Sequence, residues 1–194
     1  MAKAQFDREQ VIHDSTQLFW QQGFSGASMQ QVCKATGLKP GSLYLAFGSK
    51  EGLYEAALEH YAIQAQGKVR QTLENAPSVG EGICQVLNQM VEDSKQADYC
   101  SCFLIKSQLE LATMGGELLE KISGYLGAME ELYTEFLCRE YPKEQAHLYA
   151  ASLMLHTYGI RVYGYLGRCP KAMLKALQSG LPWLPWDKWA THAQ

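Results

Sequence analysis

Apolar residues recur at helical spacing along nearly the whole chain, and no segment shows the strict apolar–polar alternation of a β-strand. The first helical segment covers residues 7–22, and Gly23 can end it because glycine adopts the left-handed cap conformation without strain. Ser28 is a natural N-cap, and Gln31 three residues later fits a capping box. The pattern therefore predicts a second helix over residues 29–35.

The most informative stretch is residues 36–54, where short helices and tight turns alternate. Gly37 can close one helix, and Pro40 at the start of the next is compatible with its first turn. Gly48 and Ser49 then break this short helix before a long one begins. A helix, a tight glycine turn and a second short helix form a helix-turn-helix, which places its second helix in the major groove of DNA.

The rest of the chain reads as six further helices separated by proline, glycine and serine. They are expected over about 49–74, 79–97, 100–114, 117–140, 143–167 and 170–179. Beyond them, residues 181–189 carry three tryptophans and two prolines, and we expect this segment to pack against the body or a partner subunit, with a ligand lid as the alternative. The predicted fold class is all-α.

Charge is unevenly distributed along the 194 residues. The whole chain has a formal net charge of −3, which argues against a generic nucleic-acid binder. Residues 1–50, however, hold five basic and three acidic side chains, giving +2, whereas residues 51–194 hold twelve and seventeen, giving −5. The positive excess coincides with the predicted helix-turn-helix, so binding to DNA should be specific and sensitive to salt.

No signal peptide or membrane span is evident, because no apolar run approaches the length of about 20 residues that a bilayer requires. The cysteines are scattered and expected to be mostly thiols, at positions Cys33, Cys84, Cys100, Cys102, Cys138 and Cys169. Together these features predict a cytoplasmic protein.

A set of spaced residues in the N-terminal part resembles the DNA-binding domain of TetR/AcrR-type transcriptional regulators over about residues 7–60. The matching positions are Gly23-Phe24, Ser28, Val32, Gly37-Leu38, Gly41-Ser42-Leu43-Tyr44, Phe47 and Ser49-Lys50-Glu51-Gly52-Leu53. The resemblance implies a helix-turn-helix domain over residues 1–48 and a helical ligand-binding and dimerisation domain over 49–194. It also implies a homodimer that binds double-stranded operator DNA, usually as a repressor, and that a small-molecule effector releases.

The resemblance also supplies candidate DNA contacts. Ser28, Ser42, Tyr44 and Lys50 match family positions that hold the phosphate backbone, and Lys39 and Gly41 match positions close to base edges. Lys50 also opposes the positive end of a helix dipole, which a phosphate contact would explain; an ordinary solvated lysine is the alternative.

The chain departs from the common family pattern after Tyr44, where Leu45 and Ala46 replace an aromatic residue and a histidine. Apolar side chains at these positions can touch a thymine methyl group but donate no hydrogen bond. The operator sequence is therefore not predictable from the resemblance.

Two C-terminal helices are too apolar for the surface of a monomer. The helix expected over residues 143–167 carries one apolar stripe formed by Leu148, Ala151, Leu155, Tyr158, Val162 and Tyr165. Leu153, Ile160 and Gly164 add apolar or small surface on the other sides of this helix. A two-fold contact with a second copy, forming a four-helix bundle, would bury these faces. The alternative is that they belong to the internal core.

Candidate effector contacts are aromatic, sulfur-containing and basic residues of the middle helices, which suit a largely apolar cavity. They are Tyr99, Cys102, Phe103, Lys106, Tyr125, Met129, Tyr133 and Tyr158. Cys100 and Cys102 also admit a second hypothesis, because a thiol at a helix N-terminus with a lysine one turn on is activated toward oxidants and electrophiles. A buried inert thiol is the alternative.

Enzyme motifs are incomplete in this sequence. Gly23–Ala27 resembles a nucleophile elbow but lacks the final glycine, and the five histidines show no metal-ligand spacing. We therefore expect neither catalysis, nor a metal, nor a cofactor. The alternatives to a ligand-released regulator are a cysteine-switched regulator and a helical adaptor that does not bind DNA.

Overall fold

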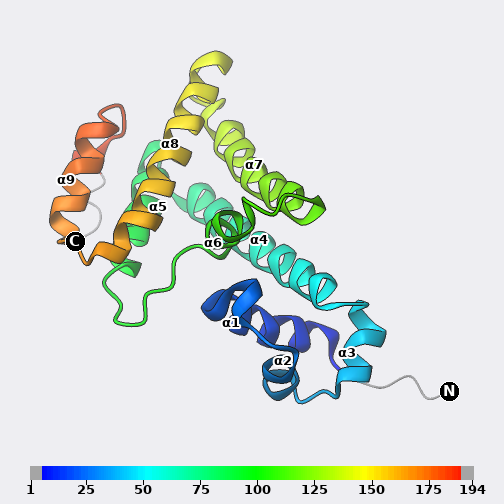
Figure 1. The fold of residues 1–194 in the computed structure, drawn as a ribbon. Coiled ribbons are helices and arrows are strands. Elements are labelled where there is room, and N and C mark those ends of the chain that lie inside the picture. Colours follow the sequence, from blue (N-terminus) through cyan, green and yellow to red (C-terminus); the bar gives the residue numbers. More distant parts are fainter. Residues whose placement is uncertain (1–5, 189–194) are drawn as a thin grey trace. The chain divides into compact units, whose positions relative to one another are not determined.

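The computed structural model describes residues 6–188, and throughout this range the ordered elements are helical, which confirms the predicted all-α class (Figure 1). The α-helices are α1 (Arg8–Gly26), α2 (Met29–Thr36), α3 (Pro40–Phe47), α4 (Lys50–Asn75), α5 (Val79–Asp93), α6 (Phe103–Leu111), α7 (Glu117–Leu137), α8 (Lys143–Tyr163) and α9 (Pro170–Gly180). A 3-10 turn, η1 (Gly164–Leu166), follows α8. No helix among these residues has both the length and the apolar content needed to cross a bilayer.

The chain forms two compact units, and each is made from two segments. The first unit holds the residues up to 64 together with 103–125, and the second holds 65–102 together with the residues from 126 onward. Neither compact unit is therefore one continuous stretch of the sequence. The assignment of residues 1–48 to DNA binding and 49–194 to ligand binding and dimerisation stays a prediction.

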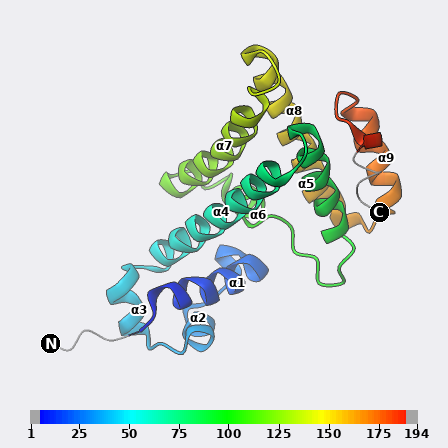
Figure 2. The ribbon, with the colours of Figure 1, turned by 180° about the vertical axis from the view of Figure 1, so that it is seen from behind.

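The helix boundaries of the first unit follow the capping chemistry expected from the sequence (Figure 2). Ser28 and Gln31 form the complete capping box at the start of α2, and Gly37 ends α2 in the left-handed conformation with φ of 69°. Pro40 occupies the first turn of α3, and Gly48 ends that helix by donating its backbone N–H to the Tyr44 carbonyl at 2.9 Å. Gly23, with φ of 76°, interrupts α1 where a stop was predicted.

An aromatic cluster around Tyr54 holds the first unit together. The Tyr54 ring is fully buried and makes edge-to-face contacts with Phe19, at 4.9 Å between centroids, and with Phe103 of α6, at 5.4 Å. Its hydroxyl lies 2.6 Å from the Ser107 hydroxyl, which itself donates to the Phe103 carbonyl, so Tyr54 is the donor. Burial raises the pKa of Tyr54 to about 12, and the phenol therefore keeps its proton.

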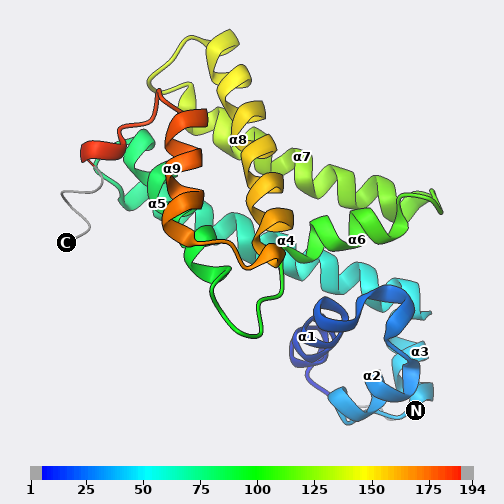
Figure 3. The ribbon, with the colours of Figure 1, turned by 60° about the vertical axis from the view of Figure 1, so that its left-hand side comes forward.

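The second unit packs α5, α7, α8 and α9 around one apolar core, and α5, α8 and α9 lie side by side in Figures 1 and 3. Phe136, Leu87 and Ile83 are among its fully buried side chains. Trp183 stacks on Tyr149 with ring centroids 3.9 Å apart, and the Trp186 indole N–H donates to the Leu181 carbonyl. Both tryptophans thus pack on the body of the unit, whereas Trp189 lies outside the described residues.

Several helix ends differ from the prediction: α6 ends at Leu111 instead of residue 114, α7 at Leu137 instead of 140 and α8 at Tyr163 instead of 167. Helix α5 ends at Asp93 instead of residue 97, because residues 95–98 are exposed and offer no large apolar side chain to pack. Helix α6 begins at Phe103 instead of residue 100, so both Cys100 and Cys102 precede the helix.

Candidate nucleic-acid interface

The outward face of α3 is formed by residues that share one side of the helix. Gly41, Tyr44 and Leu45 are spaced three and four apart, and all are exposed, whereas Leu43 on the opposite side is 1% exposed. Leu43 therefore anchors α3 to the unit. Gly41 and Tyr44, which the resemblance assigns to DNA contact, are left accessible. A Cβ added at Gly41 would meet nothing within 4 Å, so this point of α3 is open to the close approach of a ligand.

The candidate backbone contacts lie around this helix. Ser28 is exposed at the start of α2, Lys39 is exposed immediately before α3, and Ser42 is half-buried within α3. The Ser28 hydroxyl accepts from the Gln31 N–H and donates to the Gln31 side chain, so capping already explains its presence. Contact of these residues with phosphate stays a prediction.

Lys50 has partners within the protein that the sequence did not reveal. Its ammonium lies 4.6 Å from the centroid of the Phe24 ring, and its charge also stabilises the ionised form of Glu110. These contacts explain a lysine at the first turn of α4 without invoking DNA. A phosphate is therefore not required to account for this charge, although the side chain stays half-exposed and able to bind one.

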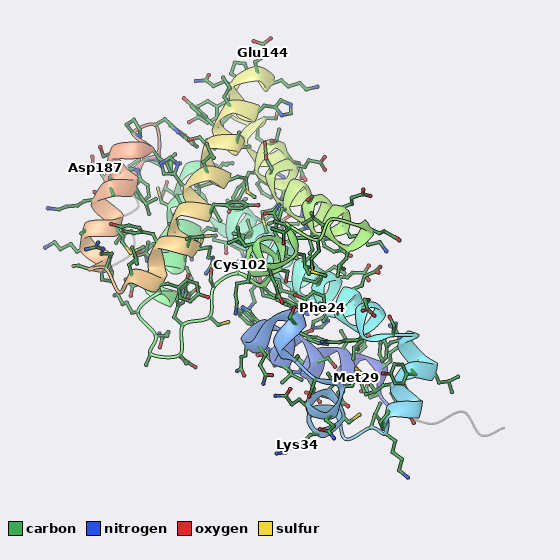
Figure 4. All side chains as sticks on the ribbon, viewed as in Figure 1. Phe24, Met29, Lys34, Cys102, Glu144 and Asp187 are labelled. Atoms are coloured by element: carbon green, nitrogen blue, oxygen red, sulfur yellow. The ribbon has the colours of Figure 1, made fainter. Side chains whose placement is uncertain are left out.

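Two further cations belong to the same unit and were missed by the sequence reasoning. Lys34 lies exposed in the last turn of α2 (Figure 4), and the Arg8 guanidinium covers the Phe47 ring of α3 at 5.0 Å. None of the ion pairs among residues 6–188 involves Arg8, Lys34, Lys39 or Lys50. The excess of basic over acidic residues in residues 1–50 was the sequence feature that could have revealed these cations.

Glu110 of α6 ties the end of α1 to the rest of the first unit. Its carboxylate accepts the backbone N–H groups of Phe24, at 3.0 Å, and Ser25, at 2.8 Å, directly after the turn at Gly23. Burial opposes ionisation of Glu110, but these amides, the Ser25 hydroxyl and Lys50 together hold the pKa of the carboxyl below its usual value. The carboxylate is thus an acceptor for the exposed backbone of the turn.

Replacing Glu110 with glutamine should lower the free energy of unfolding at pH 7 by about 1 kcal/mol, because the charged acceptor is lost. Since the folded pKa lies below the unfolded one, the difference should shrink as the pH falls below about 4.5 and Glu110 becomes protonated. Urea unfolding at a series of pH values measures both effects. Glu120→Gln, a change at an exposed carboxylate of the same unit, serves as the control. An equal loss at every pH would contradict this role.

The predicted effector residues are divided between the two units. Phe103, Lys106 and Tyr125 belong to the first unit, and the second contains Tyr99, Cys102, Met129, Tyr133 and Tyr158. Lys106 donates to the Trp20 carbonyl at 2.6 Å, and Phe103 is part of the aromatic cluster. In the second unit, Tyr133 is fully buried, and Met129 and Tyr158 pack against the core.

Tyr99 and Cys102 lie in the segment between α5 and α6. The Tyr99 ring packs on Tyr165 with centroids 5.2 Å apart, and Cys102, labelled in Figure 4, is half-buried. All the cysteines predicted to be thiols are free. The use of these residues in effector binding stays a prediction.

An open groove of about 750 Å³ lies between α8 and α9 in the second unit. Its walls include Leu155, Gly159, Tyr163, Ala172 and Ala176, and none of the predicted effector residues lines it. Leu148, Leu155 and Val162, spaced by seven along α8, are 71%, 75% and 51% exposed. By contrast Leu153 and Ile160 are buried, and Gly164 is too, so that part of the predicted surface belongs to the internal core.

Among residues 6–188, no cluster of three or more His, Cys, Asp or Glu side chains is arranged to hold a metal ion.

Comparison with known proteins agrees with this arrangement. Residues 11–57 match the family of bacterial regulatory proteins called the tetR family. The chain is 27% identical over 136 residues to the transcriptional repressor ComR of Escherichia coli K12. The matched segment covers 69% of this chain and 65% of ComR. The chain is 28% identical over 139 residues to the repressor BdcR of the same organism, covering 71% of this chain and 69% of BdcR.

Solved structures of TetR family regulators are similar to this chain over almost its full length. A cysteine mutant of the TetR family regulator CifR, complexed with 26-bp double-strand operator DNA, is 25% identical and has a TM-score of 0.77. The similarity covers 95% of this chain and 100% of CifR. Escherichia coli NemR in its reduced form, at 18% identity and a TM-score of 0.73, shares the fold.

Proposed function

Because the chain belongs to the TetR family of helix-turn-helix transcriptional regulators, we propose that it binds a two-fold symmetric operator as a homodimer and represses transcription there. The observation that carries the proposal is the exposed face of α3, bordered by cations that form no ion pair among the described residues. Such a helix fits the major groove, and the cations neutralise phosphates on either side. A target on DNA implies a cytoplasmic location.

The proposed dimer contact is the surface formed by α8 and α9. A monomer that exposes Leu148, Leu155 and Val162 along α8, with Leu155 lining an apolar groove, leaves large apolar side chains in water, which is typical of a protein interface. A two-fold contact would bury these side chains on both copies at once. Dimerisation then sets the distance between the two α3 helices of the dimer, here called its reading heads. This distance must be about 34–36 Å for the two helices to meet successive major grooves.

Release from the operator is proposed to follow binding of a small-molecule effector. A ligand that prefers a conformation with a different head spacing lowers the population able to bind DNA. The candidate contacts are the aromatic, sulfur and lysine side chains named above. No metal or cofactor is part of this proposal.

A second candidate for the release step is chemistry at Cys102. The position of its thiol directly before α6, half-buried and without a disulfide, favours this alternative. Alkylation of the thiols in the DNA-binding assay described below separates the two candidates. If alkylation releases the wild type and leaves Cys102→Ser bound, the cysteine switch is supported; release of both, or of neither, excludes Cys102 as the sensor.

The direct test is selection of bound sequences from a random duplex library with the purified protein. One palindromic sequence should be enriched, and Tyr44→Ala and Lys50→Ala should weaken its binding. Each cationic side chain that no longer neutralises a phosphate should reduce the slope of log K against log salt by about 1.

Lys68→Ala is the matched control, since Lys68 is an exposed lysine of the second unit. It should leave both the affinity and the salt slope unchanged. If no sequence is enriched in several salt concentrations and redox states, the regulator proposal fails, and a helical adaptor with an unused helix-turn-helix becomes the better hypothesis.

A further inference from the structure

Leu45 is the most exposed large apolar side chain among the described residues, with 86% of its surface accessible. It is at the centre of α3, and the neighbouring large apolar residue Leu43 is 1% exposed. Leu45 therefore contributes nothing to the core of the first unit. A side chain of this kind on a helix expected to enter the major groove is available for contact with a base.

The outward face of α3 offers little hydrogen-bonding chemistry. Gly41 has no side chain, Tyr44 contributes one hydroxyl group, and Leu45 contributes only methyl and methylene groups. The arginine, asparagine and glutamine side chains that read guanine and adenine by paired hydrogen bonds are absent from α3. Sequence discrimination at the position facing Leu45 must therefore depend on an apolar contact.

The major groove presents one apolar group, the 5-methyl group of thymine. Charge around α3 fits a nucleic-acid partner, because Lys39 precedes the helix and Arg8 lies over the ring of Phe47 at its other end. An exposed leucine between two cations is thus complementary to a thymine methyl group between two phosphates.

We propose that Leu45 determines specificity by packing against the 5-methyl group of one thymine in each half of the operator. This inference rests on the proposed function, since it requires that α3 occupy the major groove. It assigns to one residue a preference that the family resemblance leaves undefined.

The test uses the operator recovered by selection. Each thymine is replaced in turn by deoxyuridine, which removes the methyl group and keeps every hydrogen-bonding group. At one position per half-site, the affinity of the wild type should fall about 3- to 5-fold, and about 10-fold or more when both half-sites are changed. Replacement of the same thymine by 5-methylcytosine should bind more tightly than replacement by cytosine.

The decisive measurement compares variants on the two duplexes. Leu45→Ala should bind the thymine and deoxyuridine operators with nearly equal affinity, because the side chain that detects the methyl group is gone. Leu109→Ala changes a leucine that is 62% exposed on α6 of the same unit, and it should keep the wild-type difference. Circular dichroism checks that both variants stay folded.

The outcomes separate this inference from the proposed function. If an operator is enriched but contains no thymine whose methyl group affects binding, the inference is overturned and the regulator proposal stands. The inference is likewise overturned if Leu45→Ala weakens binding to both duplexes equally and keeps the thymine preference. Enrichment of no sequence at all overturns both.

Discussion

Replacing Tyr54 with alanine should lower the free energy of unfolding by about 3–5 kcal/mol, the range found when large aromatic side chains are removed from a core. The ring is fully buried against Phe19, Phe24 and Phe103, so its loss leaves a cavity and removes three edge-to-face contacts. A loss of this size is a large fraction of the roughly 5–15 kcal/mol that typically stabilises a folded protein.

Tyr54→Phe is the matched control. It keeps the ring and removes only the hydrogen bond to Ser107, whose hydroxyl still donates to the Phe103 carbonyl at 2.8 Å. The expected cost is about 1 kcal/mol, since no buried group is left without a partner. Urea unfolding followed by circular dichroism measures both variants. Equal losses in the two would show that the hydroxyl, rather than ring packing, carries the stability.

Leu155→Glu should convert the proposed dimer to a monomer and weaken operator binding about 100-fold or more. Leu155 is 75% exposed and lines the groove between α8 and α9, so a carboxylate there would be buried without a partner in a two-fold contact. Two reading heads that are no longer joined lose the high effective concentration that one bound head confers on the other.

Analytical ultracentrifugation gives the oligomeric state of this variant, and gel-shift titration gives its affinity for the selected operator. Leu109→Glu introduces the same charge at an exposed leucine of the first unit and should stay dimeric. A Leu155→Glu protein that remains a dimer would place the subunit contact elsewhere.

Local chemistry explains why the helix-turn-helix was predictable from sequence. The capping box of Ser28 and Gln31, the left-handed Gly37 and the early proline of α3 act over a few residues, and each is present in the structure as expected. The all-α class followed in the same way from periodicity. These features depend little on which segments later pack together.

Features set by tertiary packing were not predictable. The partners of Glu110 are 85 and 86 residues away in the chain, and no local pattern marks that carboxylate as their acceptor. On α8, Leu148 and Leu155 repeat at an interval of seven, and so do Leu153 and Ile160, but only the second pair is buried. Periodicity detects both stripes and cannot decide which of them meets the core.

In the candidate site, too, some features were predictable from the sequence and others depended on tertiary packing. The family resemblance and the short helix located α3, Lys39 and Lys50, whereas the contacts of Lys50 with Phe24 and Glu110 required the fold. The helical boundaries around Cys102 also depended on packing, because α5 ends where its apolar residues end and α6 begins only at Phe103. Cys102 therefore precedes the helix, instead of lying inside its first turn as the periodicity predicted.

The positions of the tryptophans give each compact unit its own fluorescent reporter. Trp20 belongs to the first unit and contacts the Tyr61 ring at 5.1 Å, whereas Trp183, stacked on Tyr149, belongs to the second. Substitution of Trp183, Trp186 and Trp189 by phenylalanine leaves Trp20 as the single indole in the chain. The emission of that protein, recorded as operator DNA is added, then comes from the indole of the first unit alone.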